Sequence, residues 1–146
     1  MFQSVQQGVL IIGSMLMLAY ALWRGGRPER VAAVFMAATW GLSWLLVDPT
    51  DWDRPQEGLL AVDVAVLAFF CVLIWRSSRR WPIFAAGFQL QSVLTHVAIG
   101  LGWDIGGWLY VTALWIWFGL MMLSLGVGTF FEVDRPRFSG NRATSE

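Results

Sequence analysis

Apolar residues run along this chain in five long stretches that short polar segments separate. The stretches cover about residues 5–23, 31–47, 58–75, 83–103 and 108–130. Each has the length of a helix that crosses the hydrocarbon layer of a bilayer, although the second, at about 17 residues, is near the lower limit. The pattern predicts an all-α integral membrane protein, with a bundle of five transmembrane helices in residues 1–131.

The fourth stretch differs from the others because one side of the predicted helix is polar. At 100° per residue, an arc of roughly 160° holds Gln89, Gln91, Ser92, Thr95 and the only histidine, His96. The opposite arc, which includes Leu90 and Leu94, has no polar side chain. Since lipid offers no hydrogen-bond partner to an amide or an imidazole, we expect the polar arc to face the bundle interior.

Composition excludes several classes of protein. The chain is 57% hydrophobic and 14% charged, and its helices lack the polar outer faces that a soluble helical protein would need. The formal net charge is zero, and no basic surface indicates a nucleic-acid partner. The lipid bilayer is the partner that this composition predicts. The single cysteine, Cys71, excludes a disulfide within the chain.

The positions of the arginines predict the orientation in the membrane. Nine arginines follow the first, third and fifth stretches, and only Arg54 lies in a connection on the other side. Positive charge is retained in the cytoplasm, so the N-terminus is expected outside and the C-terminus inside. The predicted location is the inner membrane of a bacterium. The polar tail, residues 132–146, is expected to be a disordered cytoplasmic segment.

Aromatic residues occur near the predicted ends of the spans. Amphipathic rings favour the headgroup level of a bilayer, so we expect them in two belts. The expected outer belt contains Trp44, Trp52, Trp103, Trp108 and Tyr110, and the inner belt contains Trp23, Trp75 and Trp81.

Two ionisable side chains lie within the predicted spans, at similar depth. Asp63 is about 7.5 Å from the outer end of its span and His96 about 10 Å from the same side, at 1.5 Å per residue. Their spans are consecutive and joined by a short connection, so they are expected to pack together. An isolated charge in hydrocarbon costs about 2.5–3.5 kcal/mol on insertion scales, which favours pairing of the two side chains.

Further polar residues belong to the same outer half. Together with Asp63 and His96, the candidates for a ligand- or proton-binding pocket are Ser92, Gln89, Thr95, Tyr110 and Ser43. The alternative is a polar clasp that only fixes the packing of the helices. One histidine cannot supply both axial ligands of a haem, and a zinc site lacks a third ligand. We therefore predict no metal and no cofactor.

The acidic segment 48–58 lacks the ligand register of an EF-hand. The chain also shows no Ser-His-Asp or H-E-x-x-H arrangement. No catalytic residue is predicted, and an enzyme is disfavoured. The second stretch carries Ala33, Ala37 and Gly41 at intervals of four, a small-residue groove in which another helix can approach closely. Such a groove could serve a homo-oligomer or a larger membrane complex.

Five spans, 146 residues and ten tryptophans resemble the outline of the tryptophan-rich sensory protein family, which binds porphyrins and sterols. That family's first loop is marked by a Trp-Tyr and paired-proline segment, whereas the corresponding loop here is RGGRPER, residues 24–30. No residue role is carried over from the family.

Two functions are consistent with the sequence. The first is a non-enzymatic accessory, assembly or sensory module with a polar pocket in its outer half. The second is a small proton-coupled transporter that uses Asp63 and His96, as a homo-oligomer. The first is favoured because the chain is short, has no broken helix and no internal repeat.

Overall fold

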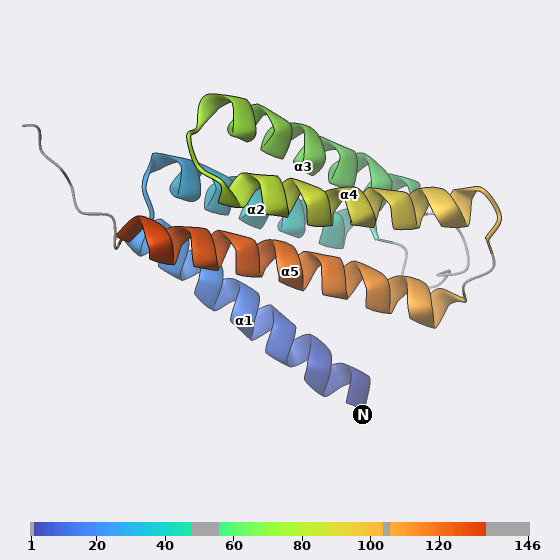
Figure 1. Cartoon of the computed structure of the whole chain (residues 1–146). Helices are drawn as coiled ribbons and strands as arrows, with labels where there is room; N and C mark the ends of the chain where they lie inside the picture. The colour runs from blue at the N-terminus through green and yellow to red at the C-terminus, as the bar shows by residue number, and fades with distance from the viewer. Residues whose placement is uncertain (1, 48–55, 104–105, 134–146) are drawn as a thin grey trace, which may run out of the picture.

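The protein is a bundle of five helices (Figure 1). The computed structural model describes residues 2–47, 56–103 and 106–133. The helices are α1 (Phe2–Arg24), α2 (Arg27–Leu46), α3 (Glu57–Arg76), α4 (Trp81–Gly100) and α5 (Gly107–Val133). The prediction of an all-α fold with five helices is therefore confirmed.

All five helices begin one to four residues earlier than the hydrophobic pattern predicts, and α2 and α4 show why. The apolar stretches start at residues 31 and 83, whereas α2 begins at Arg27 and α4 at Trp81. Each helix has a proline, Pro28 or Pro82, in its first turn. The first turn tolerates proline because its N–H groups have no partner within the helix, so these prolines open the helices and do not lie in the loops before them.

The far ends of α4 and α5 also differ from the prediction. Helix α4 stops at Gly100 and not at residue 103, because Gly102 adopts a positive φ of 82° that ends the helix. Helix α5 continues to Val133, into the segment predicted as a tail. The rest of that tail, residues 134–146, and most of the acidic segment, residues 48–55, lie outside the described residues.

Helices that follow each other in sequence pack side by side, and α5 closes the arrangement against α1 (Figure 1). We call the end of the bundle that holds Arg24, Arg27 and Arg76 the arginine end, and the opposite end the pocket end. Helices α1, α3, α4 and α5 are each long and apolar enough to cross a membrane. Helix α2 is not among them, since its first turn carries three charged residues. This is consistent with a multi-pass membrane protein.

The arginine half of the bundle is densely packed. Its largest fully buried apolar side chains are Phe70, Met36, Met122 and Leu125. Between them lie small residues without exposed surface, namely Ala21, Ala32, Ala33 and Ala85. Small side chains allow helix backbones to approach closely, so the helices converge at this end.

Gly128 of α5 lies directly against Trp81 of α4. A Cβ atom added there would overlap the ring of Trp81 and would lie 2.6 Å from the Trp81 Cβ. The indole cannot move aside, because it is buried and packs edge-on against Phe70, with ring centroids 6.0 Å apart. Any side chain at position 128 therefore has to separate the two helices.

Gly128→Ala should lower the free energy of unfolding by about 1–3 kcal/mol, the usual cost of overpacking a filled core. Denaturant unfolding of the detergent-solubilised protein would measure it. Gly87→Ala is the matched control, because Gly87 is also helical and a Cβ atom built there has no neighbouring atom within 4 Å. Equal stability of the two variants would show that the contact with Trp81 does not constrain the bundle.

The predicted interior face of α4 is confirmed by burial. Gln89, Ser92 and His96 are buried, whereas Leu90 and Leu94 are exposed. Gln91 is an exception: it was predicted on the polar arc but is exposed. It lies about 130° around the helix from the centre of the buried face, too far to turn inward.

The aromatic belts are only partly as predicted. Trp23, Trp75, Trp103 and Trp108 are exposed, and Trp75 retains 92% of its surface. The prediction is wrong for Trp81 and Tyr110, which are buried. Each has a buried hydrogen-bond partner for its polar atom, which draws the ring into the bundle. Trp52 lies outside the described residues.

The small residues of α2 do not share one environment. Ala33 is buried in the bundle, whereas Ala37 and Gly41 are exposed. No atom lies within 4 Å of a Cβ built on Gly41. The described helices of this chain therefore leave the Ala37–Gly41 surface uncovered, and its packing against a second molecule remains a prediction.

Candidate functional site

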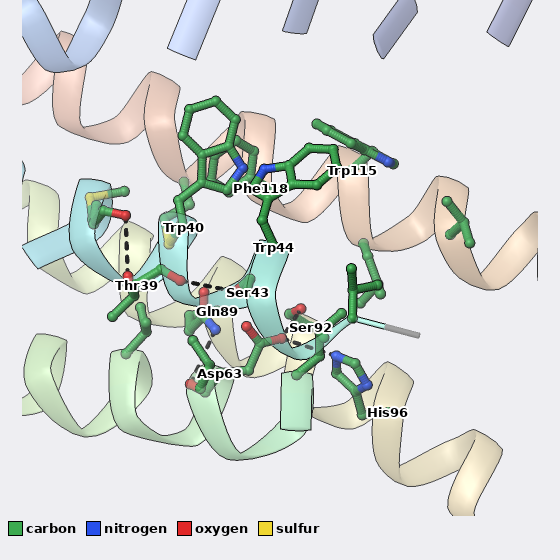
Figure 2. Close-up of a pocket in the computed structure, with 18 of the residues that line it drawn as sticks. Thr39, Trp40, Ser43, Trp44, Asp63, Gln89, Ser92, His96, Trp115 and Phe118 are labelled. Atoms are coloured by element: carbon green, nitrogen blue, oxygen red, sulfur yellow. Dashed lines mark hydrogen bonds and ion pairs between the residues drawn. The ribbon is translucent and has the colours of Figure 1, made fainter. Parts of the chain in front are cut away.

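A cavity of about 610 Å³ lies at the pocket end, between α2, α3, α4 and α5, and Gln7 of α1 also lines it. Figure 2 shows polar side chains of α3 and α4 on one side of it and aromatic side chains of α2 and α5 on the other. The polar side chains are Asp63, Gln89, Ser92 and His96; the aromatic ones are Trp40, Trp44, Trp115 and Phe118. The cavity is not sealed, because Trp44 and Trp108 on its lining are largely exposed.

Asp63 and His96 are brought together across α3 and α4. The Asp63 Oδ2 accepts a hydrogen bond of 2.5 Å from the Ser92 hydroxyl and lies 3.2 Å from the His96 Nε2. The second contact has ion-pair distance but not the alignment of a hydrogen bond, so the buried Nε2 has no hydrogen-bond partner among the described residues. We treat it as a charge contact and not as a formed hydrogen bond.

Tyr110 of α5 holds the other side of the imidazole. Its hydroxyl lies 2.6 Å from the His96 Nδ1, and both side chains are buried. The rings meet edge-on, with centroids 5.4 Å apart. A backbone hydrogen bond of Gln56, just before α3, also reaches Tyr110. Ser92, Asp63, His96 and Tyr110 thus form one continuous polar chain across three helices.

Gln89 contributes to the same chain by contacting the backbone of α3. Its side-chain amide donates a hydrogen bond of 3.1 Å to the carbonyl oxygen of Asp63. That carbonyl belongs to the residue that carries the site's carboxylate. Gln89 therefore fixes the position of α3 along the axis of α4, and with it the position of the Asp63 side chain.

The remaining predicted site residues are placed differently. The Ser43 hydroxyl lies on the cavity lining but donates to Thr39 O of its own helix at 3.0 Å. Thr95 bonds the Gln91 carbonyl and accepts a 3.3 Å hydrogen bond from the Trp117 indole, and it does not line the cavity. Ser43 therefore belongs to the lining, whereas Thr95 joins α4 to α5 outside it.

An aromatic wall faces the polar chain. The ring centroids of Trp40 and Phe118 lie 5.6 Å apart, and those of Trp115 and Phe118 lie 6.2 Å apart. Trp44 stands one helical turn beyond Trp40 on the same lining (Figure 2). Of these rings, the sequence pattern assigns only Trp44, to the outer aromatic belt, and only the packing of α2 against α5 makes them a wall.

The sequence reasoning missed a second acidic residue inside the bundle, at the arginine end. Glu29 has no exposed surface; its Oε1 accepts a 2.9 Å hydrogen bond from the Trp81 indole and lies 3.7 Å from the Arg79 Nε. Its Oε2 has no hydrogen-bond partner among the described residues. Within RGGRPER this glutamate resembles any charged loop residue, so only its contact with Trp81 distinguishes it.

The chemistry available at the cavity is that of one carboxylate, one imidazole and hydroxyl groups beside an aromatic surface. Across residues 2–47, 56–103 and 106–133, no group of three or more His, Cys, Asp or Glu side chains could hold a metal ion. Asp51 and Asp53 of the acidic segment lie outside the described residues. Comparison of the chain with protein-family models, curated proteins and solved structures finds no match.

Proposed function

We propose that this protein is a non-enzymatic module of a bacterial inner membrane that binds a small molecule in the cavity at its pocket end. It would act as a sensory, accessory or assembly subunit. The observation that carries the proposal is the polar chain from Ser92 to Tyr110, which adjoins a cavity of about 610 Å³ with an aromatic wall. Ligand sites are typically of this kind: concave, mostly apolar and equipped with a few convergent polar groups.

In this proposal all five helices cross the bilayer and the pocket end faces outward. Helix α2 crosses with its apolar part from Val31 onward, while Arg27 and Arg30 remain at the cytoplasmic surface. The asymmetry of nine arginines against one supports this orientation. The pocket would then exchange its ligand with the outer leaflet or the space outside.

The orientation is testable with single cysteines. In a Cys71→Ser background, a cysteine placed in residues 48–55 should react in intact cells with a membrane-impermeant maleimide, whereas one at Ser78 should react only after lysis. A reporter fused after Glu146 should be active in the cytoplasm. Protection of residues 48–55 in intact cells would contradict the five-span orientation.

The binding function is testable by filling the cavity. Native mass spectrometry of protein taken from its own membrane should show a retained small molecule, and Ser43→Phe should remove it. Ser124→Phe is the matched control, because each serine bonds the carbonyl four residues earlier at 3.0 Å but Ser124 does not line the cavity. Absence of a retained molecule in wild type, or equal retention in both variants, would contradict the proposal.

A second candidate is the proton-coupled transporter. The placement of His96 Nε2 beside Asp63 Oδ2 favours it, because such a pair can take up and release a proton. Proteoliposomes with an imposed pH gradient distinguish the two functions. A transporter would move protons together with its substrate and lose this activity in Asp63→Asn, whereas a binding module would leave the gradient intact.

A further inference from the structure

We infer that the ligand of the cavity is an organic cation with an aromatic or apolar body. This inference rests on the proposed binding function and narrows it to one class of ligand. It follows from three properties of the cavity: the charge of its lining, the arrangement of donors around Asp63, and the aromatic wall.

The charge of the lining favours a cation. Among the described residues that line the cavity, Asp63 is the only acidic one and none is arginine. The chain contains no lysine. An anionic ligand would therefore meet this carboxylate with no lysine or arginine among the described lining residues to offset it, at a site where low polarity strengthens the repulsion.

His96 meets this carboxylate from one side. Its Nδ1 lies 2.6 Å from the Tyr110 hydroxyl, and its Nε2 lies 3.2 Å from the Asp63 Oδ2. Tyr110 therefore holds the imidazole against one carboxylate oxygen of Asp63.

Only one of the two oxygens of the Asp63 carboxylate is occupied by side chains of the site. Both Ser92 and His96 contact the same oxygen, Oδ2. The Asp63 side chain keeps 22% of its surface exposed, and the hydrogen bonds from described side chains reach its Oδ2 and its backbone carbonyl oxygen, not its Oδ1. One carboxylate oxygen is therefore available to a ligand in the cavity.

The aromatic wall supplies the second element of cation recognition. The negative face of an indole ring attracts a cation, and the attraction grows where water is excluded. Trp40, Trp44 and Trp115 line the cavity opposite Asp63 (Figure 2). A quaternary ammonium or phosphonium centre could contact indole faces while its apolar substituents fill the remaining volume.

The test compares two ions of nearly the same shape and opposite charge, tetraphenylphosphonium and tetraphenylborate. Equilibrium dialysis against wild-type protein in phosphatidylcholine nanodiscs, corrected with empty discs, should show at least about tenfold tighter binding of the phosphonium ion, a difference of about 1.4 kcal/mol. Asp63→Asn should weaken phosphonium binding by about tenfold, whereas Glu57→Gln, at an exposed acid of the same helix outside the lining, should not.

A second pair of variants tests the wall without touching the polar chain. Trp44→Leu should weaken phosphonium binding by about threefold or more, whereas Trp75→Leu, at an exposed position outside the lining, should have no effect. The ratio of the affinities for the two ions is measured on the wild-type protein alone, so the test stands even if Asp63→Asn does not fold.

The failures of the two proposals can be told apart. Equal binding of both ions, tighter binding of the borate, or failure of the phosphonium ion to bind would overturn the inference of a cationic ligand. The binding function would survive these results if Ser43→Phe still removes the molecule retained by the wild type. If no molecule is retained either, both proposals fall.

Discussion

Glu29→Ala should lower the free energy of unfolding by about 3 kcal/mol, at the low end of the range for breaking a buried ion pair. The substitution removes the acceptor of the Trp81 indole and the partner of Arg79. Trp81 is buried, so its N–H would be left without a bond in a site that water cannot easily reach. Arg79 keeps 21% of its side-chain surface and can be rehydrated, which limits the loss.

Glu57→Ala is the matched control for this experiment. Both glutamates lie in the first turn of a helix, α2 or α3, so both interact with the helix dipole in the same way. Glu57 is exposed, and its removal should cost less than about 0.5 kcal/mol. Thermal and denaturant unfolding in one detergent would compare them. If both variants lose the same stability, Glu29 acts only on its own helix and the contact with Trp81 contributes nothing.

Asp63→Asn and His96→Ala should each destabilise the protein, and the double variant should cost clearly less than their sum. The reason is that the two residues contact each other at 3.2 Å and share one polar chain. Each single substitution should cost about 1–3 kcal/mol by leaving a buried polar partner unsatisfied. We expect a coupling energy of about 1 kcal/mol.

A second cycle provides the control for this coupling. Thr112 lies on α5 and bonds the Trp108 carbonyl of its own helix. Asp63→Asn and Thr112→Ala should therefore be additive within about 0.5 kcal/mol. Additive effects of the Asp63 and His96 substitutions would show that the two side chains do not act as a unit. If the single variants lose both stability and the retained ligand, the site is a binding pocket. If they lose only stability, it is a structural clasp.

The fold class could be predicted from the sequence because it depends on short-range properties. Apolar stretches of bilayer length have to form helices, since backbone groups in lipid have no other hydrogen-bond partner. The buried face of α4 followed in the same way, because Gln89, Ser92 and His96 recur at helical spacing. The depths of Asp63 and His96 could be compared along their helices without knowing how these helices are rotated.

The helix ends were less predictable. The hydropathy pattern marks where apolar residues stop, but a helix can continue through polar residues if its first turn tolerates them. The polar first turn of α2, with Pro28 and Glu29, is an example. The reading of Glu29 as a loop residue followed directly from that boundary error.

From the sequence alone it follows which segments are helical, which side of α4 is polar and that Asp63 and His96 need partners within an apolar bundle. Only the tertiary structure decided that Trp40 and Trp115 form a wall opposite Asp63, that Tyr110 turns inward to His96, and that Glu29 meets Trp81. Each of these contacts joins different helices. They depend on how the helices are rotated and how closely they approach, which small residues such as Gly128 set and which no periodicity within one segment specifies.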